Sequence, residues 1–372
     1  MLDVLSILGT RPEAIKMAPV ISELGRFPDR IRSLVCVTGQ HKHLVDQVLD
    51  LFRIRPDFDL DLMRPGQSLA QLTAALFQGL DGVVARGRPD WILAQGDTTT
   101  VMVAAFVAFY HRVRFGHVEA GLRTGDLNHP YPEEMNRRVA DHVADLMFAP
   151  TERNRQTLLR EGHPDPKILV TGNTVIDALL RVADLPYDWS TGPLSILPTG
   201  RRFVLVTAHR RENFGEPLRR ICAAIRELAG RFRPEGVHFV VPVHPNPNVR
   251  RALYALLSGL PNLSLIEPLD YLASVHLIKR SVLILTDSGG IQEEAPTLGV
   301  PVLVLRTTTE RPEGQATGLV RLVGTSQAGI VTEASRWLCE VTPPGISIPP
   351  TSLYGDGSAA ARIVAALLKT GA

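Results

Sequence analysis

Short apolar runs alternate with longer amphipathic segments through the first half of this sequence. The runs have the length of buried strands, and the segments between them repeat apolar residues every three or four positions, as helices do. Strands are predicted at 4–8, 34–38, 91–95, 116–118, 147–149 and 168–171, and helices at 13–24, 44–52, 69–86, 100–111 and 175–182. Such an alternation predicts a parallel sheet with helices on both faces.

A second series of the same kind follows a segment rich in proline and glycine at 187–200, which we interpret as a linker. Its strands are predicted at 203–207, 238–243, 263–266, 282–285, 300–305 and 319–323, and a last helix at 358–368. A chain of 372 residues is too long for one typical core. The predicted fold class is therefore α/β, with two Rossmann-like doubly wound domains at 1–184 and 185–355 and a C-terminal helix at 356–372.

Polar motifs follow the strands in both halves. They stand at 9–11, 38–41, 95–97, 118–121, 207–211, 243–246 and 286–288. Sheets of this kind bind ligands beyond the carboxyl ends of their strands. We therefore expect one cleft between the two halves to collect these motifs.

Composition narrows the class of protein. The net charge of +2 is too balanced for a nucleic-acid surface, and aromatic residues are too sparse for a stacking platform. Three widely spaced cysteines argue against disulfides and predict a reducing, cytoplasmic setting. A strand-like segment directly after Met1 leaves no room for a signal peptide, and no apolar run approaches the ~20 residues that span a membrane.

Three carboxylates stand where acid–base chemistry is expected. Asp97 and Glu119 follow neighbouring predicted strands, and Glu133 opens a helix after Pro132. Each has an ordinary explanation, because Asp97 suits an N-cap and Glu133 suits the first turn of a helix. Carboxylates that lie close together cannot all ionise cheaply, so a cluster supplies an acid and a base at once. Their convergence is a hypothesis that only a structure can examine.

Cationic groups and a glycine-rich turn predict an anion site. Arg11 and Lys16 follow the first strand, and His209 with Arg210 follows the first strand of the second half. The turn Ser288-Gly289-Gly290 precedes a short helical pattern at 291–298, whose N–H groups suit a phosphate. An ordinary strand–helix turn explains Ser288-Gly289-Gly290 equally well, and a solvated helix start explains Arg11 and Lys16 slightly better than a ligand does.

Several familiar chemistries lack their sequence signatures. The chain has no Gly-x-Gly-x-x-Gly dinucleotide fingerprint and no phosphate loop of the Gly-x-x-x-x-Gly-Lys-Ser/Thr type. It has no His, Cys and Asp cluster with metal-ligand spacing and no Gly-x-Ser-x-Gly turn. No cofactor and no metal are therefore predicted.

The motifs taken together resemble the non-hydrolysing UDP-N-acetylglucosamine 2-epimerases over nearly the whole chain. The segments that carry the resemblance are GTRPEAIKMAPVI, TGQH, QGDTTT, GHVEAGLRTGD, PEEMNRR, TGNTVIDAL, VTAHRRENFG, VHPNPNVR, TDSGGIQEEAPTLGVPVL and TTERPE. The resemblance implies the glycosyltransferase-B architecture, with the last helix packed back on the first domain and UDP bound by the second. It also implies reversible conversion of UDP-N-acetylglucosamine to UDP-N-acetylmannosamine, through loss of UDP to 2-acetamidoglucal and its re-addition without NAD.

The resemblance also implies roles for individual residues. The implied catalytic residues are Asp97, Glu119, Glu133 and His209. The implied substrate-binding residues are Arg11, Lys16, Arg210, Ser288, Gly289, Gly290, Glu294 and Arg311. A neighbouring site for activation by the substrate is implied at Gln40, His43, Gln67, Glu134, Arg210 and His244. A homodimer is implied in the same way, and a role in making surface polysaccharide is typical of the product.

Three alternatives to this function stay open at this point. A hydrolysing epimerase of similar sequence would release N-acetylmannosamine and free UDP. A glycosyltransferase of the same fold would keep the UDP-binding residues without needing the three carboxylates. A binding module would hold the nucleotide sugar without turnover.

Overall fold

The computed structural model describes residues 1–39, 42–64, 66–341 and 348–370. The chain divides into two compact units, of which unit 1 comprises 1–180 with 354–372 and unit 2 comprises 181–353. The chain passes from unit 1 to unit 2 inside helix α7 (Thr174–Ala183). The segment 187–200 lies within unit 2, where Leu194 and Leu197 are part of the hydrophobic core.

Unit 1 is built on a seven-stranded parallel sheet with strand order β3-β2-β1-β4-β5-β6-β7. Its strands are β1 (Leu2–Leu8), β2 (Ile31–Val37), β3 (Phe58–Asp59), β4 (Trp91–Gln95), β5 (Arg114–Val118), β6 (Leu146–Ala149) and β7 (Ile168–Val170). Its helices are α1 (Arg11–Leu24), α2 (Lys42–Phe52), α3 (Leu69–Gly87), α4 (Thr99–His111), α5 (Glu133–Val143), α6 (Glu152–Arg160), the first turns of α7, and α13 (Ala359–Thr370). The strand order reverses between β1 and β4, so a switch point lies there.

Unit 2 repeats this plan with six parallel strands in the order β10-β9-β8-β11-β12-β13. Its strands are β8 (Arg202–Thr207), β9 (Val237–Pro242), β10 (Leu263–Ile266), β11 (Ser281–Thr286), β12 (Val302–Val304) and β13 (Val320–Leu322). Its helices are α8 (Glu216–Phe232), α9 (Pro247–Leu257), α10 (Tyr271–Arg280), α11 (Ile291–Thr297) and α12 (Gln327–Arg336). The reversal of strand order lies between β8 and β11.

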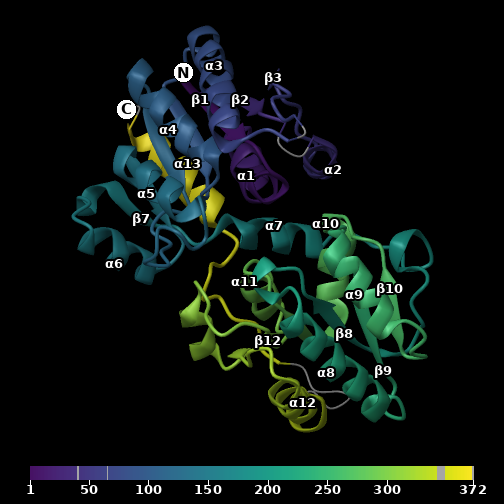
Figure 1. Cartoon of the computed structure of the whole chain (residues 1–372). Coiled ribbons are helices and arrows are strands. Elements are labelled where there is room, and N and C mark those ends of the chain that lie inside the picture. The colour runs from purple at the N-terminus through teal and green to yellow at the C-terminus, as the bar shows by residue number, and fades with distance from the viewer. Residues whose placement is uncertain (40–41, 65, 342–347, 371–372) are drawn as a thin grey trace. The chain divides into compact units, whose positions relative to one another are not determined.

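The C-terminal helix α13 is a member of unit 1 and lies among its helices, drawn in yellow in Figure 1. Asp177 of α7 accepts hydrogen bonds from the N–H groups of Ala359 and Ala360, at 3.2 and 2.8 Å. These donors are among the N–H groups that a helix start leaves without partners, so Asp177 caps α13. The chain thus closes unit 1 with its own last turns.

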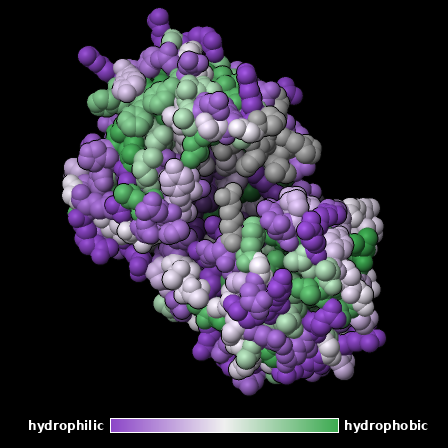
Figure 2. Space-filling model, viewed as in Figure 1, coloured by the Kyte–Doolittle hydropathy of each residue, from purple (hydrophilic) through white to green (hydrophobic). Residues whose placement is uncertain are grey.

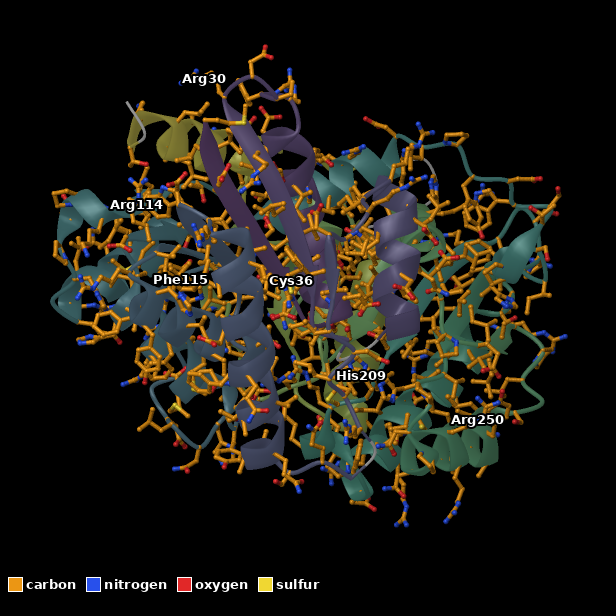
Figure 3. The ribbon with its side chains drawn as sticks, turned by 90° about the horizontal axis from the view of Figure 1, so that it is seen from above. Arg30, Cys36, Arg114, Phe115, His209 and Arg250 are labelled. Atoms are coloured by element: carbon orange, nitrogen blue, oxygen red, sulfur yellow. The ribbon has the colours of Figure 1, made fainter. Side chains whose placement is uncertain are left out.

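The predicted fold class, two Rossmann-like doubly wound domains, is confirmed. Buried apolar side chains fill both faces of the strands in unit 1; Cys36 and Phe115 are among them, while Arg30 lies at the surface (Figure 3). The predicted strands match to within two or three residues at each end. Strand β3 was missed because a two-residue strand carries too few positions to show a period.

The outer surface of unit 1 bears an aromatic cluster. Figure 2 shows hydrophobic side chains gathered over α3 and α4. Phe109 and Tyr110 of α4 are each 68% exposed, and the Tyr110 ring stacks 6.2 Å from that of Phe77 in α3. Within the described residues, no helix is both long enough and apolar enough to cross a membrane.

Candidate active site

Glu13 fastens the two loops that flank the switch point of unit 1. Its carboxylate accepts hydrogen bonds from the N–H groups of Gly9 and Thr10 after β1, and from the hydroxyl of Thr98 after β4 at 2.6 Å. Glu13 is buried, and burial raises the pKa of its carboxyl while these donors oppose the shift. A Cβ atom on Gly9 would lie 2.6 Å from the Thr100 hydroxyl oxygen, so only glycine fits there. Arg11, the first residue of α1, is thereby placed at this edge of the sheet.

Glu119 is held at the end of β5 by groups from three other parts of unit 1. Its oxygens lie 2.6 and 2.7 Å from the Lys16 ammonium and 2.9 Å from the Asn173 amide, and the Gln95 amide also donates to it. Its φ of 68° is strained for a residue with a side chain. Lys16 was expected to bind substrate, and the structure places it directly on this carboxylate.

Asp97 and Glu133 are both connected to helix α5, Asp97 through hydrogen bonds and Glu133 as its first residue. The Arg137 guanidinium donates to the Asp97 carboxylate, and the Asn136 amide donates to the Asp97 carbonyl at 2.9 Å. Glu133 precedes Arg137 by four residues and therefore shares its face of the helix. The Oε2 atom of Glu133 is buried and has no hydrogen-bond partner among the described residues. A buried carboxylate oxygen without a partner is costly, which is typical of a group kept for chemistry.

The neighbouring residue Glu134 has a different environment. It is fully buried, and its two oxygens accept from the N–H groups of Thr124 and Gly125 at 3.1 and 3.3 Å. The guanidinium groups of Arg137 and Arg138 complete its shell. Glu134 therefore anchors the loop after β5. Its expected role in substrate activation stays a prediction, and nothing in this shell leaves an oxygen for a ligand.

In unit 2, Asp287 organises the loop that follows β8. Its Oδ2 atom accepts three hydrogen bonds of 2.9 Å, from the N–H groups of His209 and Arg210 and from the Asn213 amide. Its Oδ1 atom lies 3.6 Å from Nδ1 of His209. Burial lowers the pKa of His209, and the charge of Asp287 opposes that shift. Asp287 thus holds the backbone at His209 and places its charge beside the imidazole, whose ring stacks 5.1 Å from that of His244.

Two guanidinium groups meet above Gly289. A Cβ atom at this position would lie 2.7 Å from an Arg311 nitrogen and 3.6 Å from an Arg210 nitrogen, so the missing side chain makes room for both. Arg311 is held by the buried carboxylate of Glu293. Two guanidinium groups beside this turn form a place where a doubly charged anion is stabilised. Helix α11 has only seven residues, so we assign anion binding to these side chains and not to the start of the helix.

Other candidates in unit 2 surround this turn. The Tyr271 hydroxyl donates to the Glu294 carboxylate at 3.3 Å, which fixes the direction of Glu294. The Ser288 carbonyl accepts from the Gln292 amide at 3.2 Å, and Gly290 is the residue before α11. Arg306 is buried and binds Glu212 and Glu310 at 2.6 and 3.0 Å. Burial would raise the pKa of Glu310, but the adjacent Arg306 and Arg311 lower it to about 2.

The predicted activation site is described only in part. Gln40 and the side chain of His43 lie outside the residues and side chains that the structure describes. The side-chain amide oxygen of Gln67 accepts from the Arg64 N–H at 3.3 Å. No group of three or more possible metal ligands occurs among the described residues.

Three groups that build the site were missed from the sequence: Glu13, Asp287 and Asn173. Each binds a loop far away along the chain. The signal available for Asp287 was its place directly after a strand and before a glycine pair. Glu13 carried no such signal, because an acidic residue in the first turn of a helix is ordinary.

Comparison with known proteins assigns these motifs to one group. The model of the family described as UDP-N-acetylglucosamine 2-epimerase matches residues 25–368. The UDP-N-acetylglucosamine 2-epimerase of Yersinia pestis is 51% identical over 98% of both chains. The crystal structure of the Neisseria meningitidis enzyme bound to UDP-GlcNAc has a TM-score of 0.89 at 44% identity, covering 99% of this chain and 100% of that one. The Methanocaldococcus jannaschii enzyme, in complex with UDP-GlcNAc and UDP, gives 0.83 at 32% identity with 99% and 100% covered.

Substitution at the adjacent carboxylates will separate the anchor from the chemical group. Both oxygens of Glu134 accept hydrogen bonds, so in Glu134→Gln the amide NH₂ points at other donors in either orientation of the amide. We expect the free energy of opening of α5 to fall by about 2–4 kcal/mol, measured by hydrogen exchange of its amides.

Glu133→Gln is the matched control, because the Oε2 atom of Glu133 has no hydrogen bond to lose. We expect it to change the same exchange by less than about 0.5 kcal/mol. Equal losses in the two variants would contradict this assignment.

Proposed function

The chain belongs to the UDP-N-acetylglucosamine 2-epimerase family, and from this premise we propose that it is the non-hydrolysing enzyme, an isomerase. It interconverts UDP-N-acetylglucosamine and UDP-N-acetylmannosamine. The observation that carries the proposal is the kind of side chain found after the strands at each switch point. Asp97 and Glu119 follow β4 and β5 of unit 1, and the guanidinium groups of Arg210 and Arg311 converge on Gly289 after β11 of unit 2.

The reaction proposed requires both kinds of group. The proton on carbon 2 of the sugar is not next to a carbonyl, so its direct removal is slow. A carboxylate of unit 1 takes this proton while the bond from carbon 1 to the diphosphate oxygen breaks. The electron pair of the carbon–hydrogen bond forms the double bond of 2-acetamidoglucal, and UDP leaves with the electrons of the bond that breaks. Return of a proton to the opposite face of carbon 2 and re-addition of UDP to carbon 1 give the epimer.

The carboxylates of unit 1 suit the proton transfers. Among the contacts described, the Oε2 atom of Glu133 has no hydrogen-bond partner to give up, and the Asp97 carboxylate accepts from Arg137 alone, while Asn136 donates to the Asp97 carbonyl. The Lys16 ammonium lies directly against the oxygens of Glu119, and its positive charge stabilises the ionised carboxylate. Two carboxyl groups in different environments supply an acid and a base on opposite faces of the sugar.

The cations of unit 2 suit the diphosphate. Arg210 and Arg311 converge on Gly289, and charge that builds up on the leaving oxygen is stabilised by such fixed donors. His209, with the charge of Asp287 beside it, supplies a donor to the departing oxygen. Glu294, directed by Tyr271, suits the ribose hydroxyls. The route needs no redox cofactor, because hydrogen leaves and returns to carbon 2 as a proton and no hydride is transferred at any step.

Incubation with UDP-N-acetylglucosamine in heavy water tests this function. We expect deuterium at carbon 2 of both nucleotide sugars, followed by NMR, together with formation of UDP-N-acetylmannosamine. Free N-acetylmannosamine with stoichiometric UDP would establish the hydrolysing reaction instead. Binding without deuterium at carbon 2 would fit a transferase or a sensor and would reject the proposal.

A substitution series tests the residue roles. Asp97→Asn, Glu119→Gln, Glu133→Gln and His209→Ala should each lower kcat by about 10²-fold or more, since each removes a proton donor, a proton acceptor or a charge stabiliser. Binding of UDP, measured by calorimetry, should change much less in the three carboxylate variants. Turnover that survives in all four variants would contradict the site.

We also propose that the enzyme acts as a homodimer through the aromatic surface of α3 and α4. Exposed aromatic clusters of this kind mark protein interfaces. The double variant Phe109→Asp/Tyr110→Asp should reduce the mass found by sedimentation from two chains to one. Tyr254→Asp, at an exposed position of α9, is the control that should leave two. A single chain in the unaltered protein would reject this surface.

A further inference from the structure

The structure contains a buried histidine to which the proposed mechanism gives no role. His117 of β5 is fully buried. Its Nδ1 atom lies 2.6 Å from Oδ1 of Asp141 in α5, and its Nε2 atom lies 2.7 Å from the carbonyl oxygen of Gly96 after β4. A carbonyl oxygen only accepts hydrogen bonds, so Nε2 carries a proton. The proton state of the ring therefore depends on Asp141.

Asp141 is held in its ionised form. Its Oδ2 atom accepts from the Arg123 guanidinium at 2.6 Å and from the Gly121 N–H at 3.3 Å. Burial would raise the pKa of this carboxyl, but His117 and Arg123 lower it below its ordinary value. An ionised carboxylate accepts only, so Nδ1 of His117 must also carry a proton. The ring is then an imidazolium that donates from both nitrogens.

Further charged and titratable groups lie beside this pair. Arg123 is balanced on its far side by Glu161, at 2.7 Å, and His163 stands 3.9 Å from the same carboxylate. The Phe115 ring of the same strand stacks 6.2 Å from that of His117. The titratable and charged groups around His117 are Asp141, Arg123, Glu161 and His163.

The imidazolium connects the three segments of the chain that bear the three carboxylates. The Gly96 carbonyl and the N–H of Asp97 belong to the same peptide group. A hydrogen bond that holds this oxygen therefore fixes the peptide plane from which the chain continues to Asp97. Glu119 follows His117 by two residues, and Asp141 lies on the helix that Glu133 begins. One ring thus ties together the three segments that bear the three carboxylates.

We propose that His117, kept doubly protonated by Asp141, is a positioning residue that sets the geometry of Asp97, Glu119 and Glu133. The inference rests on the proposed function, because it assigns a role in that reaction. A misplacement of about 1 Å in a catalytic group costs up to about hundredfold in rate. Loss of the ring should therefore lower kcat and leave KM nearly unchanged.

His117→Gln combined with Asp141→Asn tests the proton assignment by rescue. In His117→Gln alone, an amide that donates to Gly96 turns its own oxygen toward the ionised Asp141, so two acceptors meet. We expect kcat to fall about tenfold to hundredfold, with KM within about twofold. In the double variant the amide introduced at position 141 donates to the amide oxygen introduced at position 117, so every donor again meets an acceptor. We expect it to recover most of the lost kcat.

The control is His142→Gln, an exposed neighbour of Asp141, which should leave kcat unchanged. Nitrogen NMR of the labelled histidines provides a second readout that does not depend on activity. The ring of His117 should show two protonated nitrogens in the unaltered protein, because each nitrogen faces a group that only accepts. In Asp141→Asn it should show a single proton, on Nε2.

Each outcome decides the inference. An unchanged kcat in His117→Gln overturns the positioning role, and a singly protonated ring in the unaltered protein overturns the proton assignment. A double variant as slow as the single one also overturns that assignment. Failure of the unaltered enzyme to label carbon 2 in heavy water would reject the proposed function, while the NMR result would still report on His117.

Discussion

All parallel strands of one sheet end in the same direction, and this constraint places the chemistry of the chain. In each unit the strand order reverses once, between β1 and β4 and between β8 and β11. The connections on the two sides of a reversal leave in opposite directions, so side chains at the strand ends there are not covered by a crossover helix. Asp97 lies at one reversal and His209 at the other. The position of each follows from strand order before any detail of the side chains matters.

Buried carboxylates convert this edge into a defined geometry. Glu13, Glu134, Asp141 and Asp287 each accept several hydrogen bonds from backbone N–H groups or cations of another loop. A carboxylate accepts at two oxygens and donates from neither, so one side chain can hold two or three separate segments of the chain together. Two neighbouring residues of α5 differ sharply in what surrounds them. Glu133 has a buried oxygen without a partner among the described residues, whereas Glu134 beside it is saturated.

The sequence allowed the fold to be predicted and candidate residues to be located at the strand ends, but not how the side chains pair. Strands β4 and β10 were placed to the residue; β4 is buried throughout and opens with four apolar residues, as buried parallel strands do. Asp97 and His209 were found because strand ends are visible in the pattern. The pairing of Lys16 with Glu119 spans 103 positions, and no local period encodes it. Glu133 and Glu134 have the same side chain at adjacent positions, and only the direction in which each points from the axis of α5 gives them different surroundings.

The backbone at Glu119 adds an argument that concerns function rather than stability. Arg88 and Arg112 also have positive φ, but each ends a helix, where a left-handed residue satisfies the last carbonyl groups. Glu119 ends a strand, so no helix end accounts for its φ of 68°. Strain of this kind costs about 1–3 kcal/mol and persists only where surrounding contacts enforce it. Lys16, Gln95 and Asn173 provide those contacts, and all three act on the carboxylate itself. The strain therefore serves the direction of one carboxylate, which is what a proton transfer to a single face of a sugar carbon requires.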